Sequence, residues 1–154
     1  KQSGIDNTCM NFTTKSRYAV NALADLEYLS YYENPVTLKD IAARQGIDLT
    51  YLEQLFRKLR IAGIVKSVRG RNGGYVYASH PKNISIKNIM DAVEENLDAT
   101  KCAGTSSCHS GQQCNSHKLW DDLNNVVDEF LSDISITDLV DKPKDPHIIL
   151  KEIK

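Results

Sequence analysis

The sequence predicts a mostly α-helical chain with one small β-hairpin and a long helix near its C-terminal end. Two short amphipathic segments joined by a turn at Gly46 have the order of a helix-turn-helix. A basic, glycine-rich hairpin follows them, and this order of elements is that of a winged helix-turn-helix domain. Apolar residues at heptad spacing over residues 116–134 predict the long helix.

The first two helices are predicted from apolar spacing and from residues that cap or end helices. Residues 13–32 form the first, because apolar side chains recur there at helical spacing, at Tyr18, Ala22, Leu26 and Leu29. Pro35 ends this segment, since it lacks an N–H and restricts the residue before it. Thr37 then caps a short helix over residues 38–45, which Gly46 terminates.

The third predicted helix, residues 50–62, is the candidate DNA-reading helix. Four apolar side chains would face the core, namely Leu52, Leu55, Phe56 and Leu59. The polar side chains of the opposite face would then reach DNA, namely Thr50, Glu53, Gln54, Arg57 and Lys58. Gln pairs well with adenine and Arg with guanine, while Glu accepts from cytosine. Taken singly, each residue fits an ordinary solvated helix face about as well.

The next segment predicts a wing made of two β-rich runs, residues 64–69 and 75–78, around a basic glycine turn. Arg69 and Arg71 lie on this turn, where they would pack poorly but could enter a minor groove or contact phosphates. Residues 51–80 contain six Lys or Arg and one Asp or Glu, so a polyanion would meet this part of the chain. A plain hairpin turn is the alternative interpretation.

Two further helices are predicted after the wing. Residues 84–96 have a plausible cap at Ser85 and an apolar face made of Ile86, Ile89, Met90 and Val93. The long helix over residues 116–134 carries a stripe with steps of three and four residues, made of Trp120, Leu123, Val127, Phe130 and Ile134. This stripe is wider than one small domain needs, which predicts a homodimer joined through it. The alternative is that it packs within its own subunit.

Length and composition fit one globular domain with appendages, since 41% of the 154 residues are hydrophobic and 25% are charged. No apolar run is long enough to cross a bilayer, and no signal peptide is recognisable, so we expect a cytoplasmic protein without a membrane partner. We expect the chain to divide into five segments: an N-terminal extension over residues 1–12, a DNA-binding domain over 13–96, a cysteine-containing loop over 97–117, a dimerisation helix over 116–140 and a disordered tail over 141–154.

The stretch "CAGTSSCHSGQQCNSH" places Cys102, Cys108, Cys114 and His117 among small polar residues, where there is little for a thiol to pack against. In a reducing compartment, clustered cysteines are more often ligands than disulfides, and these four side chains suffice for one metal centre. Structural zinc sites usually contain a closer cysteine pair, whereas iron–sulfur clusters accept wider spacing. The residues alone leave zinc and iron–sulfur as equal candidates, with a disulfide or a fortuitous grouping behind both.

Residues 10–140 resemble the bacterial iron–sulfur cluster regulators of a winged-helix repressor family. The resemblance is carried by "RYAV", "YLEQLF", "VRGRNGGY", "DAT", "HKLWDDL" and the C-x5-C-x5-C-x2-H spacing. It implies a 2Fe–2S cluster on the four ligands, supplied by the cluster-assembly machinery, and a homodimer that binds a pseudo-palindromic double-stranded DNA operator. It also implies transcriptional control of cluster-assembly genes. Arg71 and Asn72 stand where this family more often has Pro-Gly, which makes the wing more basic.

The sequence therefore predicts a DNA-binding transcription regulator whose operator preference is controlled by its bound cluster. The first alternative is a zinc-stabilised repressor without a sensing role. A redox enzyme is disfavoured, because the chain has no C-x-x-C and no glycine-rich nucleotide loop after a strand. A cluster carrier that binds no DNA would leave the basic wing unexplained.

Overall fold

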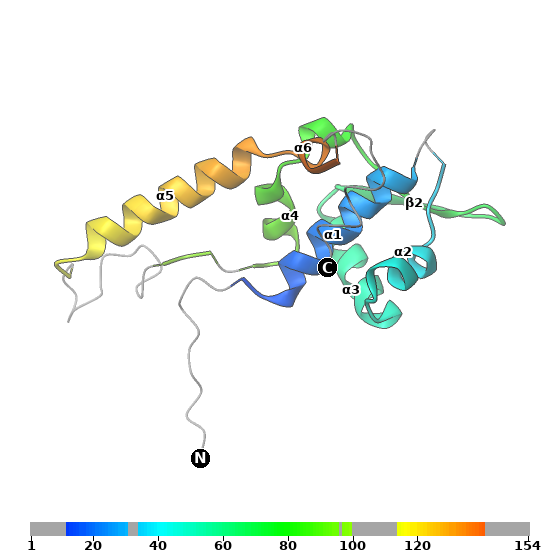
Figure 1. The fold of residues 1–154 in the computed structure, drawn as a ribbon, viewed down its shortest axis with the longest axis horizontal. Helices are drawn as coiled ribbons and strands as arrows, with labels where there is room; N and C mark the ends of the chain where they lie inside the picture. The colour runs from blue at the N-terminus through cyan, green and yellow to red at the C-terminus, as the bar shows by residue number, and fades with distance from the viewer. Residues whose placement is uncertain (1–11, 31–33, 96, 100–113, 141–154) are drawn as a thin grey trace, which may run out of the picture.

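The computed structural model describes four stretches of the chain, residues 12–30, 34–95, 97–99 and 114–140. Within them, the chain forms a packed group of α-helices, one long helix that extends away from this group, and a two-stranded hairpin that projects from one end (Figure 1). This confirms the predicted fold class, a mostly α-helical winged helix-turn-helix domain with a long C-terminal helix. Four predicted features lie outside the described residues: the extension up to residue 11, the tail from residue 141, and the ligands Cys102 and Cys108.

The helix-turn-helix consists of α2 (Leu38–Gln45) and α3 (Leu49–Ile61), and α1 (Thr14–Leu29) packs against both. The turn between α2 and α3 begins at Gly46, whose φ of 64° places it in the left-handed region, as predicted for the residue that ends α2. These three helices bury the apolar faces that their spacing predicts, and so fix the orientation of α3.

Two helix starts show how side chains set the boundaries. Thr37 caps α2, because its hydroxyl accepts a hydrogen bond from the backbone N–H of Asp40 at 3.2 Å. Asp48 caps α3, because its carboxylate accepts from the N–H of Tyr51 at 2.9 Å. Helix α3 therefore starts one residue before the predicted range, and Thr50 lies in its first turn rather than at its boundary.

The wing is an antiparallel hairpin of β1 (Val65–Val68) and β2 (Gly74–Tyr77). Val36, ahead of α2, pairs with Tyr75 through two backbone hydrogen bonds of 3.0 and 2.8 Å, so the base of the wing is tied to the helix-turn-helix. A Cβ atom at Gly74 would lie 2.5 Å from the carbonyl oxygen of Val36, which explains why glycine is needed there.

Helix α4 (Ile86–Ala92) follows a short 3₁₀ turn, η1 (Pro81–Asn83), and starts in a capping box made by Ser85 and Asn88. Its predicted apolar face is buried, namely Ile86, Ile89, Met90 and Val93. The predicted range to residue 96 is too long. The helix ends after Ala92, because the chain enters the left-handed region at Glu94, with φ of 61°.

Helix α5 (His117–Asp133) packs against α4 and then extends beyond the rest of the molecule (Figure 1). Helix α6 (Ile136–Val140) turns back onto α1. Between these two helices, Ile134 accepts a backbone hydrogen bond from the N–H of Ile86 at 2.9 Å. The C-terminal end of α5 is thereby fixed to the start of α4.

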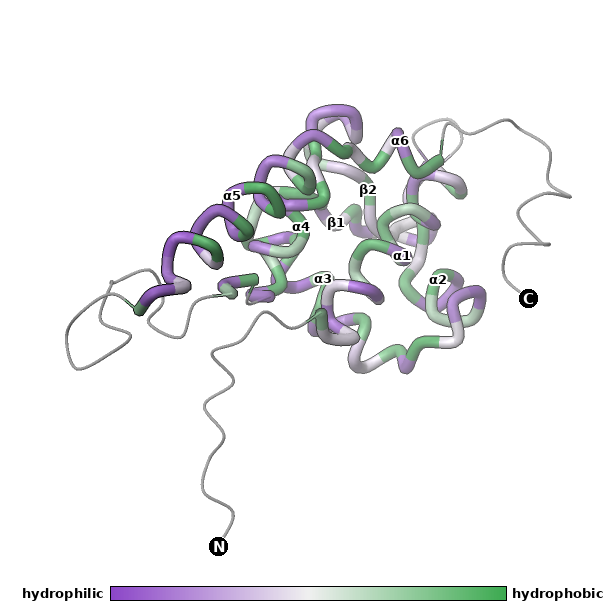
Figure 2. Tube along the Cα trace, turned by 60° about the vertical axis from the view of Figure 1, so that its left-hand side comes forward, coloured by the Kyte–Doolittle hydropathy of each residue, from purple (hydrophilic) through white to green (hydrophobic). Residues whose placement is uncertain are grey.

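The core lies where α1, α2, α3, α4 and α6 meet, and the hydrophobic segments of these helices converge there (Figure 2). Its largest fully buried side chains come from all five helices: Leu23, Leu26, Ile41, Leu52, Phe56, Leu59, Ile89 and Ile136. Over the stretches that the structure describes, no helix has both the length and the apolar composition to cross a membrane.

Candidate nucleic-acid interface and metal-ligand segment

The polar face of α3 is open to solvent at four of the five positions predicted to read DNA, namely Thr50, Glu53, Gln54 and Arg57. The opposite face is buried at the predicted positions, Leu52, Leu55, Phe56 and Leu59. A reading helix needs this division, because its apolar face must hold it on the domain while its polar face enters the groove.

Lys58 differs from the other four predicted DNA contacts. Its Nζ atom lies 2.8 Å from Oε2 of Glu94, just after α4, and its side chain is 37% exposed. The pairing joins the second half of α3 to the segment that leads toward the cysteines. Sequence reasoning missed it because the two residues are 36 positions apart.

The tip of the wing presents Arg69 and Arg71 to solvent. The turn that follows Arg69 and contains Arg71 closes through a hydrogen bond from the N–H of Gly73 to the carbonyl oxygen of Gly70, at 3.0 Å. Both arginines are therefore carried by a tight turn, free of the core, at the far end of the hairpin. This placement suits contact with phosphates or a minor groove.

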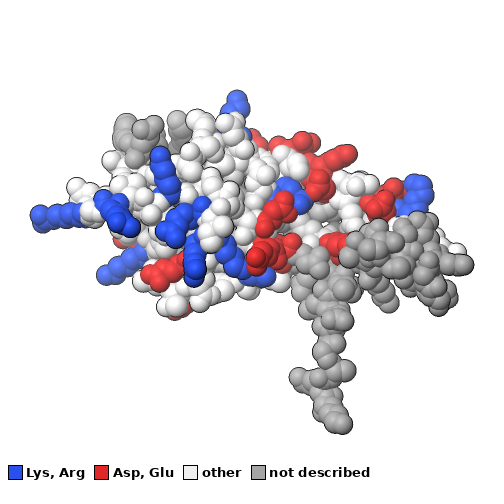
Figure 3. All heavy atoms as spheres, turned by 180° about the vertical axis from the view of Figure 1, so that it is seen from behind, with Lys and Arg blue, Asp and Glu red and all other residues white. Residues whose placement is uncertain are grey.

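Charge is divided between the two ends of the molecule. Lys and Arg side chains gather at the end that carries the wing and the helix-turn-helix, whereas Asp and Glu gather toward α5 (Figure 3). The division matches the sequence, in which residues 51–80 contain six Lys or Arg against one Asp or Glu and residues 81–154 contain thirteen Asp or Glu against eight Lys or Arg. A polyanion would approach the wing end first.

Two of the four predicted ligands, Cys114 and His117, lie in the described residues at the start of α5. The backbone N–H of His117 donates to the carbonyl oxygen of Cys114 at 3.1 Å, so a single turn brings the two residues together. His117 is 9% exposed, and Cys114 is half-buried. Ser116, between them, accepts a hydrogen bond from the indole Nε1 of Trp120 at 3.1 Å, which holds this turn on the helix.

The side chains of Cys114 and His117 are chemically suited to bind a metal. A thiolate and an imidazole on one turn can bind a soft or borderline metal ion. Within the described stretches no three His, Cys, Asp or Glu side chains come together as a metal site, and Cys102 and Cys108 lie outside them. Cys114 and His117 thus form the described half of the predicted ligand set.

The segment ahead of the cysteines is tied to α5 by one asparagine. Oδ1 of Asn124 accepts from the backbone N–H of Ala99 at 2.7 Å, and its Nδ2 donates to Oδ1 of Asp98 at 2.8 Å. The side-chain amide of Asn124 therefore uses its acceptor and a donor on two neighbouring residues of one segment. No feature of the sequence pattern indicated this role, although Asp98 and Ala99 belong to the "DAT" stretch that carries the family resemblance.

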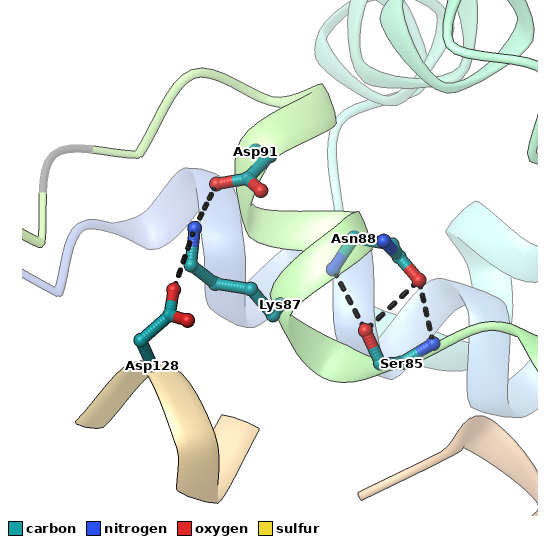
Figure 4. A network of polar contacts seen from close by, with 5 residues as sticks. All are labelled: Ser85, Lys87, Asn88, Asp91 and Asp128. Carbon is teal, nitrogen blue, oxygen red and sulfur yellow. Dashed lines mark hydrogen bonds and ion pairs between the residues drawn. The ribbon is translucent and has the colours of Figure 1, made fainter. Parts of the chain in front are cut away.

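A second polar contact joins α4 to α5. Nζ of Lys87 lies 2.5 Å from Oδ1 of Asp91 on its own helix and 3.3 Å from Oδ1 of Asp128 on α5 (Figure 4). Burial alone would lower the pKa of Lys87, but the hydrogen bonds and charges of the two aspartates outweigh it and raise the pKa. Lys87 therefore stays charged and holds the two helices together.

The apolar stripe of α5 splits into two sets. Val127 and Ile134 pack against the core of their own chain, as does Leu131. Five large apolar side chains of the helix remain exposed, namely Leu119, Trp120, Leu123, Val126 and Phe130. Trp120, Leu123 and Phe130 are thus the members of the predicted dimerisation stripe that the subunit leaves uncovered.

Comparisons with known proteins agree with this geometry. Residues 12–142 match the model of the Rrf2 family, described as iron-dependent transcriptional regulators. The chain is 48% identical over 131 residues to the HTH-type transcriptional regulator IscR of Vibrio campbellii, which covers 85% of this chain and 77% of that protein. The solved structure of T. potens IscR has a TM-score of 0.69 and 33% identity, covering 94% of this chain and 89% of that one. CymR, the global cysteine regulator of B. subtilis, has a TM-score of 0.73 and 31% identity, covering 85% and 96%.

Proposed function

Because this chain belongs to the Rrf2 family of iron-dependent transcriptional regulators, we propose that it binds double-stranded DNA as a homodimer under the control of a 2Fe–2S cluster. Like its relatives, it is a transcription regulator and not an enzyme. The single observation that carries the proposal is the exposed polar face of α3 beside a basic wing, on a domain whose apolar faces are buried.

On the DNA side, Glu53, Gln54 and Arg57 would read base edges, and Thr50 would accompany them at the start of the helix. Arg69 and Arg71 on the wing would contact phosphates or the minor groove. Such a regulator acts on chromosomal DNA, so we expect it in the bacterial cytoplasm.

On the metal side, Cys102, Cys108, Cys114 and His117 would hold the cluster. The donor chemistry of Cys114 and His117 suits it, and the iron dependence of the family favours iron over zinc. When bound, the cluster would supply a redox-sensitive and labile group whose presence reports iron–sulfur status. The genes under control would be those for cluster assembly, whose products would also supply the cluster.

The homodimer would form through the exposed apolar face of α5. A two-fold arrangement presents two reading helices to a pseudo-palindrome, with half-sites about 34 Å apart or a multiple of that distance. Because the ligands lie between the DNA-binding domain and α5, cluster binding would set how each domain sits on the dimer axis, and hence which operators are bound.

The decisive experiment is anaerobic purification followed by analysis of iron, acid-labile sulfide and zinc. We expect visible absorbance with iron and sulfide, lost in each of Cys102→Ala, Cys108→Ala and Cys114→Ala. The control is Cys9→Ala, which changes the remaining cysteine of the chain, outside the predicted ligand set, and should retain the absorbance. Stoichiometric zinc without sulfide would overturn the cluster and favour a zinc-stabilised repressor. Operators are then selected from random duplexes with apo and cluster-bound protein, and identical preferences would contradict control by the cluster.

A further inference from the structure

The end of α4 has a helix-terminating geometry with an unexpected residue in it. The backbone N–H of Glu95 donates to the carbonyl oxygen of Met90 at 2.9 Å, and that of Glu94 donates to Asp91 at 3.1 Å. This pair of hydrogen bonds is a Schellman motif, whose left-handed position is usually occupied by glycine. Here that position is Glu94, with φ of 61°.

Glu94 is unusual within the described part of the chain, where no other residue besides glycine has a positive φ. A side chain with a Cβ is disfavoured in this region, so a glycine would form the same turn with less strain. A residue that breaks a local preference in this way often has a role for its side chain. The carboxylate of Glu94 has such a role, because it reaches the reading helix.

The contact of that carboxylate is with Lys58 of α3. The distance from Nζ of Lys58 to Oε2 of Glu94 is 2.8 Å, and the two side chains are 37% and 74% exposed. The hydrogen bond and charge of Lys58 hold the pKa of Glu94 below its usual value, with a smaller contribution from the charge of Lys15. The pair is too exposed to serve mainly as a source of fold stability.

Lys58 lies in the second half of α3, where a reading helix usually meets phosphate rather than base edges. Its ammonium group is instead occupied by a carboxylate from the same chain, which binds lysine with the charge and oxygen atoms that a phosphate would offer. Two other basic side chains in the second half of α3, Arg57 and Arg60, are exposed.

We propose that Glu94 is a positioning residue of the DNA interface, which holds Lys58 away from the DNA backbone and so removes one phosphate contact per subunit. This inference rests on the proposed DNA binding by α3 and the wing. Specific binding then depends more on the base contacts of the reading helix, while the affinity for DNA of any sequence is kept low. Weak general binding raises the ratio of specific to non-specific affinity, which is the quantity that matters in a genome.

The test is the salt dependence of binding to a fluorescein-labelled duplex of random sequence, measured by anisotropy from about 50 to 200 mM KCl. We expect Glu94→Gln to steepen the slope of log affinity against log salt by about 0.9 per subunit, as one added phosphate contact requires. Lys58→Gln should leave the wild-type slope unchanged, and in the Glu94→Gln background it should remove the gain.

The matched control is Asp122→Asn, which releases Lys118 from an exposed ion pair of 2.7 Å at the far end of α5 and changes the net charge equally. It should leave the slope unchanged. Glu94→Gly is the second variant, because it removes the carboxylate and relieves the strained backbone, so it should steepen the slope while raising the melting temperature.

The outcomes separate the two proposals. If Arg71→Gln flattens the slope but both Glu94 variants behave as wild type, the role of Glu94 is wrong and the DNA surface stands. A loss of slope on Lys58→Gln alone would also overturn the role of Glu94, since Lys58 would then already contact phosphate. If Arg71→Gln leaves the slope unchanged, the assigned DNA surface itself is wrong.

Discussion

Asn124, in the middle of α5, accepts a hydrogen bond from the backbone N–H of Ala99 at 2.7 Å. Ala99 lies three residues before the first predicted ligand, and Asn124 lies seven residues after the last. One hydrogen bond therefore joins the two sides of the ligand stretch at points close to both of its ends. The segment that leaves the DNA-binding domain is therefore in direct contact with the long helix.

We expect Asn124→Ala to loosen this junction. The backbone N–H of Ala99 and the carboxylate of Asp98 each lose a partner, which should cost about 1 kcal/mol in the free energy of unfolding. Urea unfolding measures that cost, and amide hydrogen exchange at Ala99 should accelerate. The neighbouring Asn125, which is exposed, gives the control Asn125→Ala. Equal exchange at Ala99 in the two variants would contradict a role for this contact.

The hydrogen bonds and the lowered pKa of Glu95 predict that the stability of the fold depends on pH. Its carboxylate accepts hydrogen bonds from the N–H and the hydroxyl of Thr13 at 3.1 and 2.8 Å. Burial alone would raise the pKa of Glu95, but hydrogen bonds from Ser16 and Thr13 outweigh burial and lower it. In the unfolded chain the pKa returns to about 4.3, so around and below that pH the unfolded state binds a proton that the folded state still excludes.

The contribution of Glu95 is therefore present above its unfolded pKa and is lost as the pH falls through its folded pKa. We expect the free energy of unfolding to decrease between about pH 5 and pH 3, and to decrease less in Glu95→Gln. Urea unfolding at a series of pH values measures this. Glu129→Gln, an exposed position of α5, is the control and should follow the wild type. Parallel curves for wild type and Glu95→Gln would refute the assignment.

The proposed dimer interface is best tested at Phe130, which is 63% exposed and lies outside the core. We expect Phe130→Asp to give a folded monomer, because a charge replaces an exposed apolar side chain of the proposed contact between subunits. Sedimentation velocity measures the change, and circular dichroism checks the fold. Val127→Asp is the contrasting variant, since Val127 packs on its own core and the substitution should destabilise the fold. A wild-type monomer would exclude the interface.

Substitutions of base-contacting and of phosphate-contacting residues should have different effects on DNA binding. Gln54→Ala should cost about 1–3 kcal/mol at particular base pairs and relax discrimination there. Arg71→Ala should weaken binding to all sequences alike and flatten the salt dependence by about 0.9 per lost phosphate contact. Anisotropy titrations with a selected operator and a random duplex measure both effects. Equal losses on the two duplexes for Gln54→Ala would show that it reads no base.

The helix-turn-helix could be predicted closely because local rules decide it. Apolar spacing fixed the buried face of α3, and Thr37 and Gly46 marked the ends of α2 as short polar caps and glycine usually do. Helix α4 was predicted too long, because no glycine marks its end. Glu94 takes the left-handed position instead, and neither composition nor spacing indicates that.

The contacts that organise the site could not be predicted, because they join residues far apart in sequence. Lys58 and Glu94 are 36 positions apart, and Ala99 and Asn124 are 25 apart. Helical spacing could show that α5 had an apolar stripe. It could not show which members face the chain's own core, since that depends on where α4 places the helix.

The backbone pairing beside α5 makes that helix a lever. Ile86 donates to Ile134 at 2.9 Å and Ile136 donates to Ile84 at 3.1 Å, so the C-terminal end of the helix is a pivot held on the core. The 17 residues of α5 span about 25 Å, and a rotation of about 5° at the pivot would move His117 by about 2 Å. In reverse, a displacement of about 2 Å at His117 would turn the helix by about 5° at the pivot. Asn124 and Asp128 lie nearer the pivot than His117, so the same rotation would shift their contacts with Ala99 and Lys87 by a smaller distance.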